Sequence, residues 1–164
     1  MRRLALIILV VLALCGAAAT ASSYARAAAH KHRKTHAAQS RAARLTRLTR
    51  RLVSYARQQL GTTYRIGGTS PAYGFDCSGL VYAAYRSVGI TVPRTSWEQL
   101  RAGRRVSWGG LRAGDLLFTN GGGHVVLVVS RRLAISAPHS GARVRIVPLS
   151  AYRTSFYAGR RLLA

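Results

Sequence analysis

Cysteine is almost absent from this chain of 164 residues, which contains only Cys15 and Cys77. We expect Cys15 to be removed with an N-terminal leader, so Cys77 has no partner within the chain and an intramolecular disulfide is excluded. An unpaired cysteine in an exported protein either packs as a small apolar side chain or acts as a nucleophile. The polar neighbours Asp76 and Ser78 favour the nucleophile, because they make a buried apolar site awkward.

Long hydrophobic runs are also missing. The apolar stretch Leu4–Leu14 is shorter than the roughly 18 residues that span a bilayer. Two arginines precede this stretch, and Ala19-Thr20-Ala21 follows it in the form of a signal peptidase site. We therefore predict a signal peptide at residues 1–21, an exported protein, and no membrane contact apart from that peptide. Lipid attachment at Cys15 is the weaker alternative, because Leu14 stands where a small residue is usual.

Acidic residues are the third scarcity. The chain has 26 lysines and arginines against 3 aspartates and glutamates, a formal net charge of +23. Eight basic residues precede Leu45, so 18 basic and 3 acidic residues leave +15 on residues 45–164. Such a charge attracts polyanions. Export points to the anionic polymers and stem-peptide carboxylates of a bacterial cell wall, and we expect no specific nucleic acid partner.

Residues 22–44 contain mostly alanine, serine and basic residues without apolar periodicity. We predict a basic, disordered tether. Its histidines His30, His32 and His36 have no acidic or thiol residue nearby, which argues against a metal site. We expect no metal and no cofactor anywhere in the protein.

Residues 45–164 are long enough for one domain with one core and too short for two. Apolar periodicity predicts helices over 45–60 and 80–88, ended by Gly61 and Gly89, and the form of a capping box predicts a short helix over 95–101. Short β-branched runs then predict strands at residues 115–119, 124–129, 133–136 and 144–148. This order indicates an α+β fold in which N-terminal helices pack on one side of a C-terminal antiparallel sheet.

Cys77 stands at the start of the second predicted helix. A helix N-terminus or a neighbouring imidazolium lowers the pKa of a thiol, and the thiolate is the form that attacks. His124 opens a strand after a glycine-rich loop and is the candidate base; His139 is the only other histidine after residue 45. A papain-like hydrolase has this arrangement, with the nucleophile on a helix and the general base on a strand.

The chain resembles the NlpC-type bacterial cell-wall cysteine peptidases from about Leu48 to Arg161. The resemblance rests on these segments: Ala56–Gly61, Tyr64 with Gly67-Gly68, Phe75–Leu80, Pro93–Ser96, Gly114–Leu116, His124-Val125 and Ala137–Gly141. It implies a papain-like fold and hydrolysis of peptidoglycan stem peptides, commonly between D-glutamate and the following diamino acid. It also implies Cys77 as nucleophile and His124 as base.

The same resemblance implies that Tyr64, Asp76 and Ser78 line the pocket for the N-terminal side of the substrate. The Cys77 N–H would help to bind the oxyanion. Two positions depart from the family pattern: Ile66 replaces a bulky aromatic residue, and Ser136 replaces the polar residue, often histidine, that completes the catalytic group. Ser136 and His139 are the two candidates for that third role.

Other interpretations stay open. Asp76 could serve as the salt-bridge partner of an arginine, and Asp115 could order a turn. The arginines of 101–112 and 131–132 could form a solvated surface that meets the wall. The alternatives to an endopeptidase are a cationic wall-binding protein of weak or no activity on the same scaffold, and a Cys/His amidase or acyl transferase. We expect a monomer.

Overall fold

The computed structural model describes residues 33 and 36–163. These residues belong to two units, which are divided between Arg44 and Leu45. The predicted signal peptide, Cys15 and most of the predicted tether lie outside the described residues. Residues 36–44 are helical, so the prediction of disorder is wrong there. Alanine, glutamine and arginine dominate this segment, and their high helix propensity explains a helix that needs no apolar stripe. No helix in the described part of the chain is long and apolar enough to cross a membrane.

The predicted helices of the second unit are confirmed, with small shifts at their ends. Residues 45–58 are helical and bury Leu52 and Ala56 completely. Helix α2 spans Cys77–Arg86, so it begins at the candidate nucleophile. The short helix α3 spans Ser96–Gln99, and its predicted capping box is present: Thr95 Oγ1 accepts from the Glu98 N–H, and the Glu98 carboxylate accepts from the Thr95 N–H.

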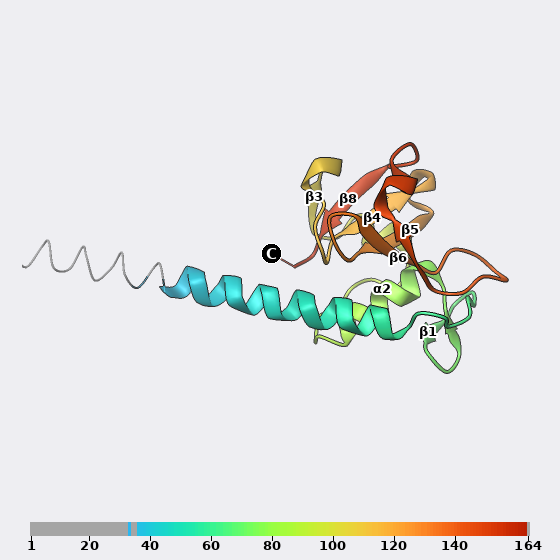
Figure 1. Ribbon diagram of the computed structural model, residues 1–164, viewed down its shortest axis with the longest axis horizontal. Helices are drawn as coiled ribbons and strands as arrows, with labels where there is room; N and C mark the ends of the chain where they lie inside the picture. Colours follow the sequence, from blue (N-terminus) through green and yellow to red (C-terminus); the bar gives the residue numbers. More distant parts are fainter. Residues whose placement is uncertain (1–32, 34–35, 164) are drawn as a thin grey trace, which may run out of the picture. The chain divides into compact units, whose positions relative to one another are not determined.

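A six-stranded antiparallel sheet follows the helices (Figure 1), which confirms the predicted α+β class. In spatial order its strands are β3 (Arg104–Val106), β8 (Ala158–Arg161), β4 (Leu116–Thr119), β5 (His124–Val128), β6 (Leu133–Ser136) and β7 (Arg145–Pro148). A separate two-stranded sheet joins β1 (Thr69–Ser70) to β2 (Gly74–Phe75), and 3₁₀ turns cover Trp108–Gly110, Asn120–Gly122 and Leu149–Tyr152. The four short apolar runs became β4 to β7, whereas the arginine-rich β3 and β8 were not predicted.

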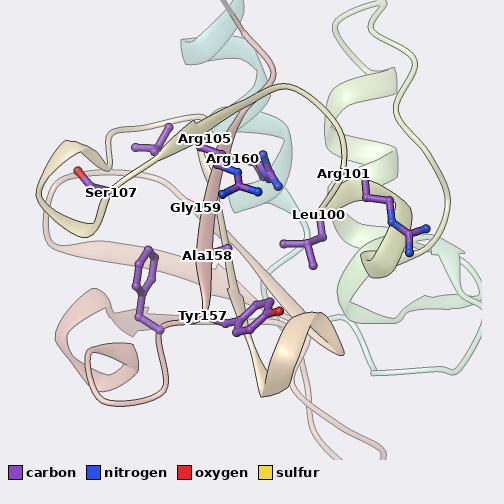
Figure 2. A pocket seen from close by; sticks show the side chains of 10 residues that line it. Leu100, Arg101, Arg105, Ser107, Tyr157, Ala158, Gly159 and Arg160 are labelled. Atoms are coloured by element: carbon purple, nitrogen blue, oxygen red, sulfur yellow. The ribbon is translucent and has the colours of Figure 1, made fainter.

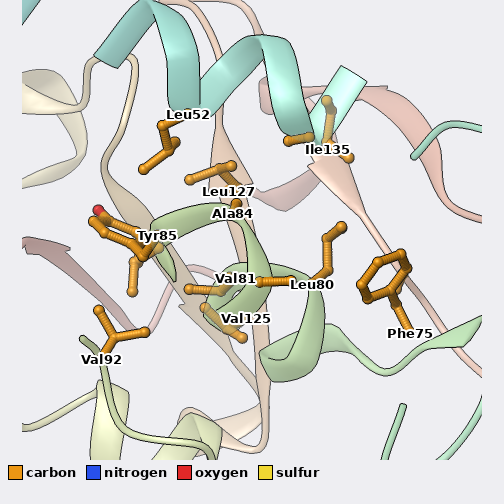
Figure 3. Packing of buried hydrophobic residues seen from close by; sticks show 14 of the residues in the cluster. Leu52, Phe75, Leu80, Val81, Ala84, Tyr85, Val92, Val125, Leu127 and Ile135 are labelled. Atoms are coloured by element: carbon orange, nitrogen blue, oxygen red, sulfur yellow. The ribbon is translucent and has the colours of Figure 1, made fainter. Parts of the chain in front are cut away.

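The central strands β4, β5 and β6 are buried on both faces, so they read as nearly unbroken apolar runs. On the helix side, α2 and Leu52 pack against alternate strand residues, as Figure 3 shows for Val125, Leu127 and Ile135. The residues between them point to the other face and form a second cluster under the loops: Val106, Leu111, Leu117, Val126, Val128, Ala134 and Leu149. Strand β5, which begins with His124, lies in the middle of the sheet and packs against α2.

A buried ion pair ties the last strand to the start of β4. The Asp115 carboxylate accepts hydrogen bonds from Nε and Nη2 of Arg161, both at 2.6 Å, and from the Arg112 N–H at 2.8 Å. Asp115 is 1% exposed and Arg161 6% exposed. The expectation that Asp115 orders a turn is confirmed by its bond to Arg112, and the pair also explains how an arginine is accommodated in the interior.

Arg161→Gln should destabilise the domain by about 3 kcal/mol or more, because it leaves the Asp115 carboxylate buried without its cation. Arg104 lies opposite Arg161 in the β3–β8 register and is exposed, so Arg104→Gln is the matched control and should change stability by less than about 0.5 kcal/mol. Urea unfolding of the two variants measures the difference. Equal losses for both would show that the ion pair is not what holds β8 in place.

Candidate active site

Cys77 is the first residue of α2 and is half-buried beneath β5. Backbone N–H groups of Val125, Ser78 and Cys77 itself point to the sulfur. Burial nevertheless raises the pKa of the Cys77 thiol above its ordinary value, and the nearby Asp76 carboxylate adds to the rise. The expectation of a lowered pKa is therefore wrong for this structure, because desolvation of the thiolate outweighs the N–H groups that stabilise it.

Asp76 is the N-cap of α2 and holds the segments around the nucleophile together. Its Oδ1 accepts from the Gly79 N–H at 2.6 Å, the Ser78 hydroxyl at 3.2 Å and Arg94 Nη1 at 3.1 Å. Its Oδ2 accepts from Arg94 Nη2 at 2.6 Å and the Gly67 N–H at 2.9 Å. Burial raises the pKa of Asp76, but the bonds from Arg94, Gly79 and Gly67 outweigh it and lower the pKa overall.

The salt-bridge interpretation of Asp76 is thus confirmed, with Arg94 as the partner. Ser78 is buried and its hydroxyl also accepts from Arg94 Nη1 at 3.0 Å. Both side chains are committed to bonds within the protein, so their direct role in substrate binding stays a prediction. Arg94 lies in the motif segment Pro93–Ser96, to which the sequence analysis assigned no role. Because acidic residues are scarce in this chain, a salt bridge between Asp76 and an arginine could be expected from the sequence.

Two glycines let the loop before β1 approach the start of α2. A Cβ on Gly79 would lie 1.9 Å from the Gly68 carbonyl oxygen, and one on Gly68 would lie 2.3 Å from the Gly74 carbonyl oxygen. The Gly68 carbonyl accepts from the Asp76 N–H at 3.2 Å, and Gly67 has a φ of +75° that directs its own N–H to the Asp76 carboxylate. Gly68 is therefore required by its close contact with the backbone of Gly74, and Gly67 by its positive φ.

His124 is the first residue of β5 and is half-buried. Its Nε2 lies 3.3 Å from the hydroxyl of Ser136, which ends the neighbouring strand β6 and is 1% exposed. Burial lowers the pKa of His124, and the charge of His139 lowers it further. His139 itself is exposed, with Nδ1 2.9 Å from the Ser140 carbonyl. Of the two candidates for the third role, the structure places Ser136 on the imidazole.

The fold brings the predicted site residues together around α2 and β5. Val125, whose N–H faces the Cys77 sulfur, directly follows His124. Tyr64 joins the group through its backbone bridge to Phe75. Burial raises the pKa of the Tyr64 phenol, and the charges of Cys77 and Asp76 raise it further, so the phenol lies within their electrostatic reach.

Gln99 is a supporting residue that the sequence did not indicate. It is fully buried, and its Nε2 donates to the carbonyls of Ser78 at 3.1 Å and Pro93 at 2.8 Å. It thereby links α3 to the first turn of α2. Across the described ranges, residues 33 and 36–163, no group of three or more His, Cys, Asp or Glu side chains could hold a metal ion.

Gly79→Ala should destabilise the protein by about 2 to 3 kcal/mol, because the added methyl group meets backbone atoms of Gly68 that cannot move aside cheaply. Gly109→Ala is the control: nothing lies within 4 Å of its Cβ position. Thermal unfolding of both variants gives the comparison. A Gly79 variant as stable as the Gly109 variant would contradict the close packing described here.

Known proteins share this architecture. The murein DD-endopeptidase MepH of Escherichia coli K12 is 40% identical over 128 residues, which cover 73% of this chain and 47% of MepH. A gamma-D-glutamyl-L-lysine dipeptidyl-peptidase of Bacillus cereus is 37% identical over 120 residues, 68% of this chain and 36% of the relative. The chain thus spans less than half the length of these curated relatives.

The solved structure of the peptidoglycan hydrolase RipB from Mycobacterium tuberculosis matches with a TM-score of 0.68 and 30% identity, over 74% of this chain and 68% of that one. The family profile of NlpC/P60 matches residues 61–161, which contain Cys77, His124 and Ser136. Because that match includes most of the chain and the whole of the site, the protein belongs to the NlpC/P60 family, as the sequence motifs indicated.

Proposed function

We propose that this protein is a cysteine peptidase that hydrolyses peptidoglycan stem peptides. The observation that carries the proposal is the placement of Cys77 at the N-terminus of α2, against the strand that begins with His124. Ser136 holds the His124 ring from the side of Nε2, which leaves Nδ1 as the nitrogen for the thiol proton. The names of MepH and the Bacillus cereus relative support the substrate class.

The proposed chemistry starts from a neutral thiol and a neutral imidazole. Burial raises the pKa of Cys77 and lowers that of His124, so both groups are uncharged near pH 7. As the sulfur attacks the scissile carbonyl, the thiol proton passes to His124, which acts as general base. As the family resemblance implies, the Cys77 N–H would donate to the developing oxyanion at the helix N-terminus.

Collapse of the tetrahedral intermediate breaks the C–N bond, and His124 returns its proton to the departing amine. The acyl group is then bound to Cys77 as a thioester. A water molecule attacks this thioester while His124 takes one of its protons, and that proton restores the thiol when the C–S bond breaks. The Ser136 hydroxyl keeps the ring in place in both steps, although a hydroxyl lacks the charge that would favour the imidazolium further.

We propose the bond between D-glutamate and the diamino acid as the scissile bond. The two relatives are named for different bonds, one as a DD-endopeptidase and one as a gamma-D-glutamyl-L-lysine dipeptidyl-peptidase. The family resemblance assigns Tyr64, Asp76 and Ser78 to the N-terminal side of the substrate, and these residues lie together at the start of α2. Arg94 forms a salt bridge with Asp76 on this side.

Two observations favour a second candidate. The raised pKa of Cys77 lowers the thiolate fraction, and a single neutral hydroxyl holds His124. These features fit a cationic wall-binding protein of weak activity on the same scaffold. An amidase or acyl transferase would use the same Cys77 and His124 and would differ in its products alone.

Export and wall association complete the proposal. The predicted signal peptide at residues 1–21 supports a location outside the cell, and the formal charge of +23 supports contact with anionic wall polymers as well as stem peptides. The protein is proposed to act as a monomer without a specific nucleic acid partner.

Digestion of purified peptidoglycan and soluble stem peptides tests the activity. The wild type should release products cleaved after D-glutamate, and Cys77→Ala should reduce the rate by at least about 10³-fold, because no other nucleophile can form the thioester. Mass spectrometry reads the products, and circular dichroism of the variant shows that it is folded. Fragments from another bond would reject the proposed cleavage position, and undiminished cleavage by the variant would reject Cys77 as nucleophile.

The pH dependence follows from the environment of His124. Because its pKa is lowered, the neutral base persists below the ordinary value of about 6.5, so the acid limb of kcat/KM should have its midpoint below pH 6.5. His139→Gln removes a repelling charge and should move that midpoint upward. Arg132→Gln, at the other end of β5, is the control and should leave it in place. A downward shift for His139→Gln would contradict this account.

A further inference from the structure

A cavity of about 590 Å³ lies over strands β3 and β8 (Figure 2). We call it the arginine pocket, because Arg101, Arg105 and Arg160 line it together with Leu100 and Tyr157. None of the residues assigned above to catalysis or to the N-terminal side of the substrate lines this cavity. Its function therefore has to be derived from its own side chains.

Two of its arginines are held against each other. Arg105 on β3 and Arg160 on β8 are directly opposite in the antiparallel register, so both side chains project from the same face of the sheet. Figure 2 shows them next to one another at the pocket. Like charges directly opposite on neighbouring strands are destabilising. An anion between them would turn this repulsion into binding.

Among the described residues, no aspartate or glutamate forms a salt bridge with Arg105 or Arg160. Its only acidic residues are Asp76, Glu98 and Asp115. Asp76 pairs with Arg94, Asp115 pairs with Arg161, and Glu98 completes the capping box of α3. Among the described residues, moreover, Arg160 Nε is buried without a hydrogen-bond partner. The pocket therefore contains guanidinium donors that an external oxyanion can satisfy.

The pocket and Tyr64 lie on opposite sides of His124. Along the sheet, β5 is followed on one side by β4, β8 and β3, which carry the pocket, and on the other by β6 and β7. The segment of Tyr64 is bonded to the chain just before β7, through the Tyr64 N–H and the Ala142 carbonyl. A peptide that extends from Tyr64 across His124 in this direction would reach the strands that carry the pocket.

The wall of the pocket reaches the loop that carries His124. Leu100 packs against Gly122, two residues before His124, where an added Cβ would lie 2.7 Å from Leu100 Cδ2. On the strand side, the Tyr157 N–H donates to the Phe118 carbonyl, next to Thr119, which pairs with His124. Two residues that line the pocket, Leu100 and Tyr157, thus contact segments next to His124.

The separation suits a short peptide. Arg160 lies two strands away from His124 and three residues further along, which corresponds to about 14 Å between their backbones for strands about 4.8 Å apart with a rise of about 3.3 Å per residue. An extended peptide covers about 3.5 Å per residue. Two or three residues beyond the scissile bond, together with the length of an arginine side chain, bridge this distance.

We infer that the arginine pocket binds a carboxylate of the stem peptide on the leaving-group side of the scissile bond. Guanidinium groups bind carboxylates through two parallel hydrogen bonds, so the Arg105–Arg160 pair would both hold and orient the peptide. The inference rests on the proposed function, because the occupant is the leaving group of that reaction. A discrete cavity, rather than an extended basic groove, favours one carboxylate over a phosphate polymer.

Kinetics of the full-length protein with two substrates test the inference. One is a stem peptide with a free C-terminal carboxylate on the leaving-group side, and the other is the same peptide amidated there. Arg105→Gln and Arg160→Gln should raise KM for the acid about 10- to 100-fold, the loss expected for a hydrogen bond to a charged group, with kcat nearly unchanged. For the amide, the same variants should change KM less than about twofold.

Arg132→Gln removes the same charge from an exposed turn and should leave both substrates unaffected. Thermal unfolding controls for folding: Arg105→Gln and Arg160→Gln should be as stable as the wild type or more stable, because a repulsion is removed. Equal changes for acid and amide would overturn the inference. So would variants that lose binding to a poly(glycerol phosphate) polymer while KM for the acid stays constant, since the pocket would then be a polymer site.

Equilibrium binding separates this inference from the proposed function. Cys77→Ala protein should bind the acid peptide at least tenfold more tightly than the amide, and adding Arg105→Gln should abolish the preference. If the wild type cleaves neither peptide but this preference is observed, the proposed reaction fails while the carboxylate site stands. If cleavage occurs without any preference, the reaction stands and the carboxylate site is rejected.

Discussion

The Asp76 carboxylate is the interaction on which the site depends. It caps α2 through the Gly79 N–H, fastens the preceding loop through the Gly67 N–H and binds Arg94 through both of its oxygens. These bonds connect the first turn of α2, the loop that contains Gly67 and the segment of Arg94. Because five donors share one half-buried carboxylate, the group stays ionised and the start of the helix is held rigidly. The position of the nucleophile is thus determined by its neighbour in the chain.

The extreme shortage of acidic residues gives each carboxylate a separate structural task. Asp76 organises the nucleophile, Asp115 accommodates Arg161 in the interior, and Glu98 starts the helix that carries Gln99 toward α2. Within residues 33 and 36–163, no other arginine forms a salt bridge. The protein therefore combines a well-ordered interior with a positively charged surface that attracts anions. This surface suits a proposed substrate rich in carboxylates.

The site is also a compromise between burial and reactivity. The same packing that places Cys77 under β5 removes its sulfur from water and raises its pKa, and it lowers the pKa of His124. Cys77 and His124 are therefore both neutral in the free protein. They become charged only when the thiol proton moves to His124 during attack on the substrate. Ser136 is consistent with this arrangement, because a hydroxyl can hold a neutral ring without requiring an imidazolium.

Periodicity, capping and turn residues were enough to predict the local structure: the helices followed by Gly61 and Gly89, Cys77 at the start of α2, the apolar strands and the α+β class. The family motifs pointed to His124 and Ser136. Which groups meet depends on the folded chain: Arg94 pairs with Asp76, Ser136 rather than His139 contacts His124, and Arg105 lies opposite Arg160. Strands β3 and β8 escaped prediction because arginines form them, and pairing and burial depend on contacts between segments far apart in the chain.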